Sequence, residues 1–205
     1  MGHFGVRHSQ GREGTAAHGV GAPTLATTTI EAVRAEFGRY RRLLELAVAQ
    51  VDDAAFFAPA GSDGNSIAII VQHLAGNLRS RFTDFLTTDG EKPWRHRDVE
   101  FEEPLRDRTV LLDHMQASWA ILDAALDDVA AENAWLQTVT IRKQPLTVME
   151  ALYRSLAHHA YHVGQVVLLA RNAAGAGWVS LSVPKGESAA YEANPTREKS
   201  PDGGL

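Results

Sequence analysis

Hydrophobic residues recur at alternating steps of three and four in four separate stretches of the chain, the spacing that lines one face of an α-helix. These stretches run from about Thr29 to Val51, from Ser66 to Thr87, from Leu105 to Val129, and from Thr147 to between Asn172 and Gly177. Helices of this kind bury their apolar faces against one another. The pattern therefore predicts an all-α protein built as a four-helix bundle.

Local signals mark where two of these helices begin. Ser66 suits the N-cap of the second helix, since its hydroxyl can accept a backbone N–H. Thr147, with Glu150 three residues later, has the sequence of a capping box. From Trp135 to Pro145, hydrophobic and polar residues alternate with period two. We therefore expect a short extended or hairpin segment before the last helix.

The remaining stretches lack helical periodicity. Residues 1–24 are rich in glycine and contain scattered histidines, which predicts a disordered leader. Residues 88–104 hold turn residues and many charges, and we expect a long ordered loop there. Residues 178–184 are expected to pack as an extended tail, and residues 187–205 to be flexible. One domain, residues 25–186, lies between these ends.

Composition narrows the possible functions. A chain of 205 residues, 44% of them hydrophobic, can bury one substantial core. The net charge of −5 comes from interspersed acidic and basic residues, so no basic face for nucleic acid is evident. No apolar run reaches the roughly 20 residues that span a bilayer, which predicts a soluble cytoplasmic protein with no membrane partner. The absence of cysteine excludes disulfides, thiolate metal ligands and a cysteine nucleophile.

The last predicted helix carries two histidines one turn apart, His158 and His162, in a segment that is otherwise apolar nearly all round. Such a helix is buried on most sides, so its polar side chains face an internal cavity or cleft. Both imidazoles then point the same way and can hold one ion. Metalloproteases of the His-Glu-x-x-His type need glutamate directly after the first histidine, where this chain has His159. A zincin peptidase is therefore not expected.

The second predicted helix has polar residues at intervals of four, His73, Asn77 and Arg81, beside its apolar face. Helix bundles place metal ligands in the core from facing helices, so His73 can join His158 and His162. Three neutral imidazoles bind a divalent metal and leave positions open for water or substrate. The alternative is that these histidines are ordinary polar residues, satisfied within the bundle without a metal.

A histidine midway along the second helix, followed after a long gap by His-x-x-x-His on the last, resembles the DinB-like superfamily. The likeness extends over about Thr29 to Gly186, and its motifs are residues 65–77, the Asp-Gly-Glu-Lys-Pro-Trp-Arg loop at 89–95, and residues 158–165. The resemblance implies a bundle of up-down-down-up topology, often a homodimer, that binds zinc, nickel or a similar ion through His73, His158 and His162. Some relatives transfer a low-molecular-weight thiol to an electrophile, and many have no known activity.

Two functional hypotheses follow from the motifs and the resemblance, and the sequence leaves open whether the protein is an enzyme. In the first, it is a metal-dependent transferase or hydrolase that activates a low-molecular-weight thiol or water for attack on a small-molecule electrophile. In the second, the metal only joins two helices of a non-catalytic dimer with a stress-related or partner-binding role.

Six residues are candidates for substrate contacts under the first hypothesis: Asn77, Arg81, Trp94, Arg154, Tyr161 and Gln165. Arginine can bind a carboxylate through two hydrogen bonds, and amide and phenol groups can orient an electrophile. Arg81 also has a structural interpretation, as a surface pair with Asp84, and Trp94 can anchor its loop instead of closing the site. His159 and His114 are expected to be a packing residue and a surface residue.

Overall fold

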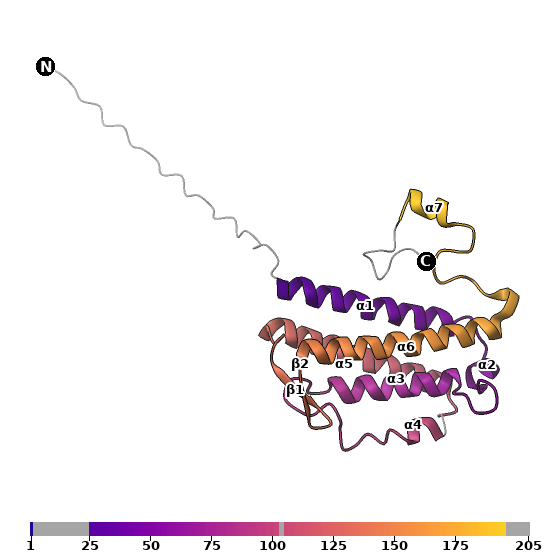
Figure 1. The fold of residues 1–205 in the computed structure, drawn as a ribbon, viewed down its shortest axis with the longest axis horizontal. Helices are drawn as coiled ribbons and strands as arrows, with labels where there is room; N and C mark the ends of the chain where they lie inside the picture. The colour runs from indigo at the N-terminus through magenta and orange to yellow at the C-terminus, as the bar shows by residue number, and fades with distance from the viewer. Residues whose placement is uncertain (2–24, 103–104, 196–205) are drawn as a thin grey trace.

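A computed structural model describes Met1, residues 25–102 and residues 105–195. This part of the chain is mostly helical, which confirms the all-α class. Four long helices lie side by side (Figure 1): α1 (Leu25–Val48), α3 (Ile67–Phe82), α5 (Arg108–Glu132) and α6 (Val148–Ala174). The leader predicted at residues 1–24 lies, apart from Met1, outside the described residues.

Helices α1 and α6 run in one direction, and α3 and α5 run in the other (Figure 1). Arg108, the first residue of α5, donates to the carbonyl oxygen of Val48, the last residue of α1, at 2.7 Å. Gln50, just after α1, exchanges hydrogen bonds with the backbone of Val179, which follows α6. Thus α5 begins, and α6 ends, at the end of the molecule where α1 ends.

The core is formed by the apolar faces that the periodicity predicts. Phe37 of α1, Leu74 of α3 and Trp119 of α5 are all almost completely buried. The rings of Phe37 and Trp119 meet edge to face, with 6.4 Å between their centroids. His159 of α6 joins them at 5.7 Å from Phe37 and 5.6 Å from Trp119. His159 is therefore a packing residue, as expected.

Both predicted N-caps are present. Ser66 Oγ accepts the N–H of Ile69, and Thr147 with Glu150 forms a complete capping box. The end of α3, however, comes at Phe82 and not near Thr87. Thr83 has an extended backbone and Asp84 a left-handed one with φ of 48°, so the helix cannot continue.

Short elements join and follow the long helices: α2 (Asp53–Phe57), α4 (Val99–Glu102), the antiparallel strands β1 (Thr138–Ile141) and β2 (Gln144–Thr147), the 3₁₀ turn η1 (Gly175–Gly177), and α7 (Ser188–Ala193). The hairpin confirms the extended segment before the last helix. Helix α7 lies within the tail predicted for residues 187–205, where an alanine-rich sequence favours helix. Residues 196–205 lie outside the described residues. No helix within the described ranges has the length and apolar content needed to cross a bilayer.

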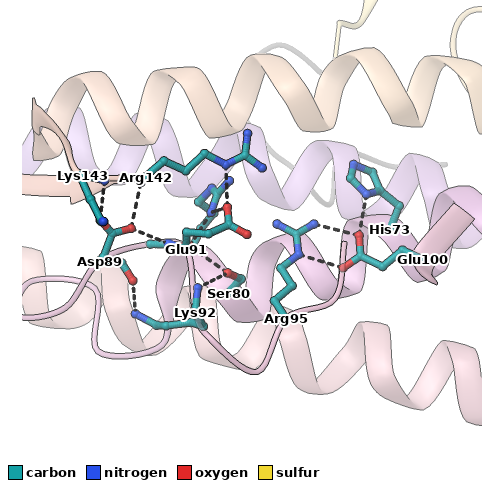
Figure 2. A network of polar contacts seen from close by, with 11 residues as sticks. His73, Ser80, Asp89, Glu91, Lys92, Arg95, Glu100, Arg142 and Lys143 are labelled. Atoms are coloured by element: carbon teal, nitrogen blue, oxygen red, sulfur yellow. Dashed lines mark hydrogen bonds and ion pairs between the residues drawn. The ribbon is translucent and has the colours of Figure 1, made fainter. Parts of the chain in front are cut away.

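The β1–β2 turn rests on the loop that follows α3. Its two central residues, Arg142 and Lys143, have φ of 54° and 64°, as the tight turn of a hairpin requires. The Asp89 carboxylate accepts the backbone N–H of both, at 2.9 and 2.7 Å, and that of Glu91 at 2.7 Å. Gly90 N–H donates to the carbonyl of Thr140 at 2.8 Å. These bonds fasten the hairpin to the loop (Figure 2).

The Asp89 carboxylate is expected to stabilise the protein in a way that depends on pH. Burial opposes ionisation, but the three backbone N–H donors outweigh it and lower the pKa of the Asp89 carboxyl from 3.8 to about 2. Its contribution to stability is therefore complete above pH 3.8 and is lost as the pH falls through about 2. We expect Asp89→Asn to lower the free energy of unfolding in urea by about 1 kcal/mol near neutral pH.

The loss caused by Asp89→Asn should shrink toward pH 2, where the parent carboxyl also becomes neutral. Asp113→Asn is the matched control, because Asp113 is exposed on α5 and its stability difference should not follow this pH profile. Equal stability of the parent and Asp89→Asn at neutral pH would contradict the role of Asp89.

Candidate metal centre

Three histidines meet between α3 and α6. His73 lies midway along α3, and His158 and His162 lie one turn apart on the facing side of α6. One ring nitrogen from each lies within 4.8 Å of the others, and Nε2 of His73 is 3.2 Å from Nε2 of His158. His73 is buried, and the other two are half-buried. This group can hold a metal ion.

His73 is oriented by a carboxylate from the loop (Figure 2). Its Nδ1 lies 2.8 Å from Oε2 of Glu100, which belongs to the short helix α4. Arg95 donates to both oxygens of the same carboxylate, from Nε and Nη2, each at 2.8 Å. The side chains of His73, Arg95 and Glu100 are only 3, 2 and 11% exposed. A charge buried this far requires such pairing.

The protonation of this group follows from its partners. Burial opposes ionisation of Glu100, but the hydrogen bonds from Arg95 and His73 outweigh it, so the pKa of this carboxyl lies below its usual value. An ionised carboxylate only accepts hydrogen bonds. Nδ1 of His73 must therefore carry a proton, which leaves a lone pair on Nε2 when the ring is neutral.

Gly76 makes room for this carboxylate. A Cβ atom at Gly76, one turn after His73 on α3, would lie 2.2 Å from Oε1 of Glu100. That separation is far below contact distance, so any larger residue would displace the carboxylate. Gln72 fixes the same region of the loop, since its Nε2 donates to the carbonyl of Glu100 at 3.1 Å and its Oε1 accepts the N–H of Leu105 at 3.0 Å.

His162 is oriented from its own helix. Its Nδ1 is 2.7 Å from Oε1 of Gln165, and Gln165 Nε2 is 3.4 Å from the hydroxyl of Tyr161. Since an amide oxygen only accepts, Nδ1 of His162 is protonated and its Nε2 also carries a lone pair. Nδ1 of His158 is buried and has no hydrogen-bond partner among the described residues.

The surroundings of His158 and His162 favour the neutral form of both rings. Burial, followed by the neighbouring histidines, lowers the pKa of His158 from 6.5 to about 3. Burial also lowers the pKa of His162, although the hydrogen bond that its Nδ1–H donates to Gln165 opposes this, and nearby His73 and Arg97 add to the lowering. The neutral imidazole is the form that binds metal ions.

The Nε2 lone pairs of the triad are more numerous than the N–H donors near them that could form hydrogen bonds with them. His158 can give at most one proton to the 3.2 Å contact with His73. Within the described part of the chain, no side chain donates to Nε2 of His162. The triad therefore has unused acceptor capacity at one point, which a cation would satisfy.

A cavity of about 400 Å³ lies beside the triad, and all three histidines line it. Four of the six predicted substrate residues line the same cavity: Asn77, Arg81, Arg154 and Tyr161. Gln165 instead supports His162. Trp94 lies outside the lining, exposed, with Arg79 stacked at 4.7 Å from its ring centroid. His114 is exposed, as expected.

Arg81 has partners other than the one considered from the sequence. Its Nη1 donates to the Gly90 carbonyl and lies 3.2 Å from Oε2 of Glu91. The pair with Asp84 is not formed, because α3 ends first and Asp84 turns away with a left-handed backbone. Glu91 also pairs with Arg142 at 2.8 Å, so one carboxylate is shared between two arginines.

Sequence reasoning missed several residues of the site. Arg95 and Glu100 orient His73, and Arg97, Arg142 and Ser155 line the cavity. The charged loop of residues 88–104 was expected to be ordered, but nothing in its pattern distinguished Glu100 from its neighbours. An acidic residue in a loop that returns to a histidine-bearing helix is the only signal that could have suggested it.

The fold and the triad define a mostly helical protein with a buried histidine cluster suited to a metal ion. Residues 24–187 match a family model described as "Protein of unknown function (DUF1572)", and the chain belongs to that family. Comparison with curated proteins and with solved structures gave no match.

Gly76 allows a test of the His73–Glu100 contact in the metal-free protein. We expect Gly76→Ala to leave the protein folded but to displace the Glu100 carboxylate, because the added Cβ would lie only 2.2 Å from Oε1. In histidine ¹H–¹⁵N NMR correlations, the Nδ1 proton that His73 shares with Glu100 should then exchange with water and lose its resonance. Gly164→Ala is the control, since a Cβ at Gly164 meets nothing within 4 Å. An unchanged Nδ1–H signal in Gly76→Ala would contradict the described geometry.

Proposed function

We propose that this protein is a metal-dependent enzyme that binds zinc, nickel or a similar divalent ion through His73, His158 and His162. The observation that carries the proposal is the convergence of three imidazoles, one ring nitrogen of each within 4.8 Å of the others, in a group that lacks enough hydrogen-bond donors within the described chain. The 3.2 Å between two Nε2 atoms is close to the separation of about 3.3 Å that tetrahedral geometry gives at zinc–nitrogen distances. The donor set therefore fits the ion.

The surroundings of the ligands support the same proposal. Histidines that bind metals usually donate their other ring N–H to a carboxylate or carbonyl group, which fixes the ring. Glu100 accepts this hydrogen bond from His73, and the Gln165 amide oxygen accepts it from His162. We further propose that the four long helices form a four-helix bundle of the DinB-like kind. A cytoplasmic homodimer remains a prediction.

A bound divalent metal would lower the pKa of a thiol or water and supply thiolate or hydroxide near neutral pH. The protein residues perform the other tasks. Asn77 and Tyr161 line the cavity and can donate hydrogen bonds to a small electrophile. Phe82, Phe85 and Phe101 form apolar parts of its wall and restrict water. The proposed reaction is transfer of a low-molecular-weight thiol, or of water, to that electrophile.

A non-catalytic metal site that joins α3 to α6 is the second candidate. The position of the triad between these helices favours it, since a metal there would hold them together. Structural metal sites, however, are closed by four protein ligands. The triad offers three and borders a cavity of about 400 Å³, which supports the enzyme more strongly.

Metal content is the direct test. We expect tag-free protein to bind about one zinc or nickel per chain, measured by plasma mass spectrometry after equilibration and desalting. His73→Ala and His158→Ala should lose the metal while circular dichroism shows the helical fold retained. His114→Ala, which removes an exposed histidine away from the triad, should keep it. A parent protein that is folded but takes up neither metal would refute the proposal.

Glu100→Gln tests whether the carboxylate that orients His73 raises the affinity of the triad for a metal ion. The amide keeps the shape of the side chain but removes its charge, so zinc affinity should fall by about 10- to 100-fold. Competition with a chromogenic chelator measures this change. Asp98→Asn is the control, because Asp98 is in the same loop and its side chain is 91% exposed. Equal affinities for the parent and Glu100→Gln would show that the carboxylate does not support the metal.

A further inference from the structure

Among the residues that the structure describes, no aspartate or glutamate lines the cavity beside the histidine triad, and five arginines do: Arg81, Arg95, Arg97, Arg142 and Arg154. They come from separate parts of the chain, namely α3, the loop before α4, the hairpin turn and α6. Five guanidinium groups around one cavity repel one another unless negative charge offsets them. The charge balance of this cavity therefore indicates what it binds.

Two carboxylates behind the wall offset part of this charge. Glu100 holds Arg95 through two hydrogen bonds, and Glu91 is shared between Arg81 and Arg142. The ion pairs of these three arginines therefore hold the loop and the hairpin in place.

The other two arginines, Arg97 and Arg154, are not held by a buried carboxylate and can bind a ligand. Arg154 makes no ion pair or hydrogen bond with any other residue that the structure describes. Arg97 has one acidic neighbour, Asp98 at 3.6 Å, in a pair that is exposed on both sides and is therefore weak. Arg97 stacks on the Phe101 ring at 5.0 Å from its centroid, which keeps its guanidinium at the cavity wall. Arg154 lies one helical turn before His158.

Buried polar atoms on the same wall also lack partners. Oγ of Ser155 and Nη1 of Arg95 are buried without a hydrogen bond in the described structure, although the two residues are only 7 and 9% exposed. Asn77 is 8% exposed, and no hydrogen bond of its amide to another described residue is present. All three residues line the cavity. Unsatisfied buried groups are rare in native proteins, so a ligand that accepts hydrogen bonds is the expected partner.

We propose that the cavity binds a small organic oxyanion, whose carboxylate or phosphate group lies between Arg97 and Arg154 while the rest of the molecule faces the histidine triad. Arginine binds both groups through paired N–H donors. A cavity of about 400 Å³ suits a molecule of metabolite size. This inference rests on the proposed function, because it names the substrate class of the same site.

The test is calorimetric titration of the full chain with succinate and, separately, with inorganic phosphate, in metal-free and zinc-equilibrated protein. We expect the parent to bind at least one of the two anions, and the tighter one identifies the group. Arg97→Gln and Arg154→Gln should each weaken binding roughly tenfold, the usual effect of losing a hydrogen bond to a charged group. Arg171→Gln, an exposed arginine near the end of the same helix as Arg154, should bind like the parent.

Metal content measured on the same samples separates this inference from the proposed function. Zinc bound normally, with neither anion binding at about 10 mM, would overturn the anion site and leave the metal proposal standing. Anion binding weakened by both arginine variants, in a protein that takes up no metal, would support the anion site and overturn the metal proposal. Parent-like anion affinity in Arg97→Gln and Arg154→Gln would overturn the inference, whatever the metal content.

Discussion

The contact between Glu100 and His73 connects the helical interior to the loop that covers it. A carboxylate that is only 11% exposed destabilises a protein unless its charge is compensated, and here Arg95 and His73 compensate it together. This one group joins the loop to α3 and sets the tautomer of His73, which leaves the lone pair on Nε2 when the ring is neutral. The arrangement also depends on α3 having no side chain at Gly76. The Glu100 carboxylate therefore links the loop, α3 and His73 through one set of contacts.

How far the sequence predicts this protein depends on the range of the interactions. The helix caps at Ser66 and Thr147 involve residues three apart, and local reasoning finds them. The pairing of His158 with His162 is equally local, since helical geometry alone places them together. Bringing His73 to them required only that α3 and α6 face each other in the core. Glu100 is different, because it lies 27 residues from His73 and its position depends on a turn, a short helix and a glycine.

The arginines show why the details of a site are harder to predict than its existence. Arg81 and Arg154 have the same chemistry and line the same cavity, yet Arg81 is held by a glutamate and a carbonyl, whereas Arg154 has no partner among the described residues. Sequence spacing suggested Asp84 as a partner for Arg81, but the helix ends between them. The partner that Arg81 does have, Glu91, belongs to a loop whose path is determined by the hairpin. Charge patterns identify which residues matter, and tertiary structure decides their roles.

Helix α6 presents consecutive histidines to opposite environments. His158 faces the cavity, while His159 is completely buried between Phe37 of α1 and Trp119 of α5, and its Nδ1 is 2.9 Å from the Ser155 carbonyl. The side chains of adjacent residues on a helix point about 100° apart. Any rotation of α6 that moved His158 would therefore drive His159 against two aromatic rings of the closely packed core. Packing in the aromatic core thus restricts rotation of α6, so the direction of the two α6 imidazoles depends on Phe37 and Trp119, which do not line the cavity.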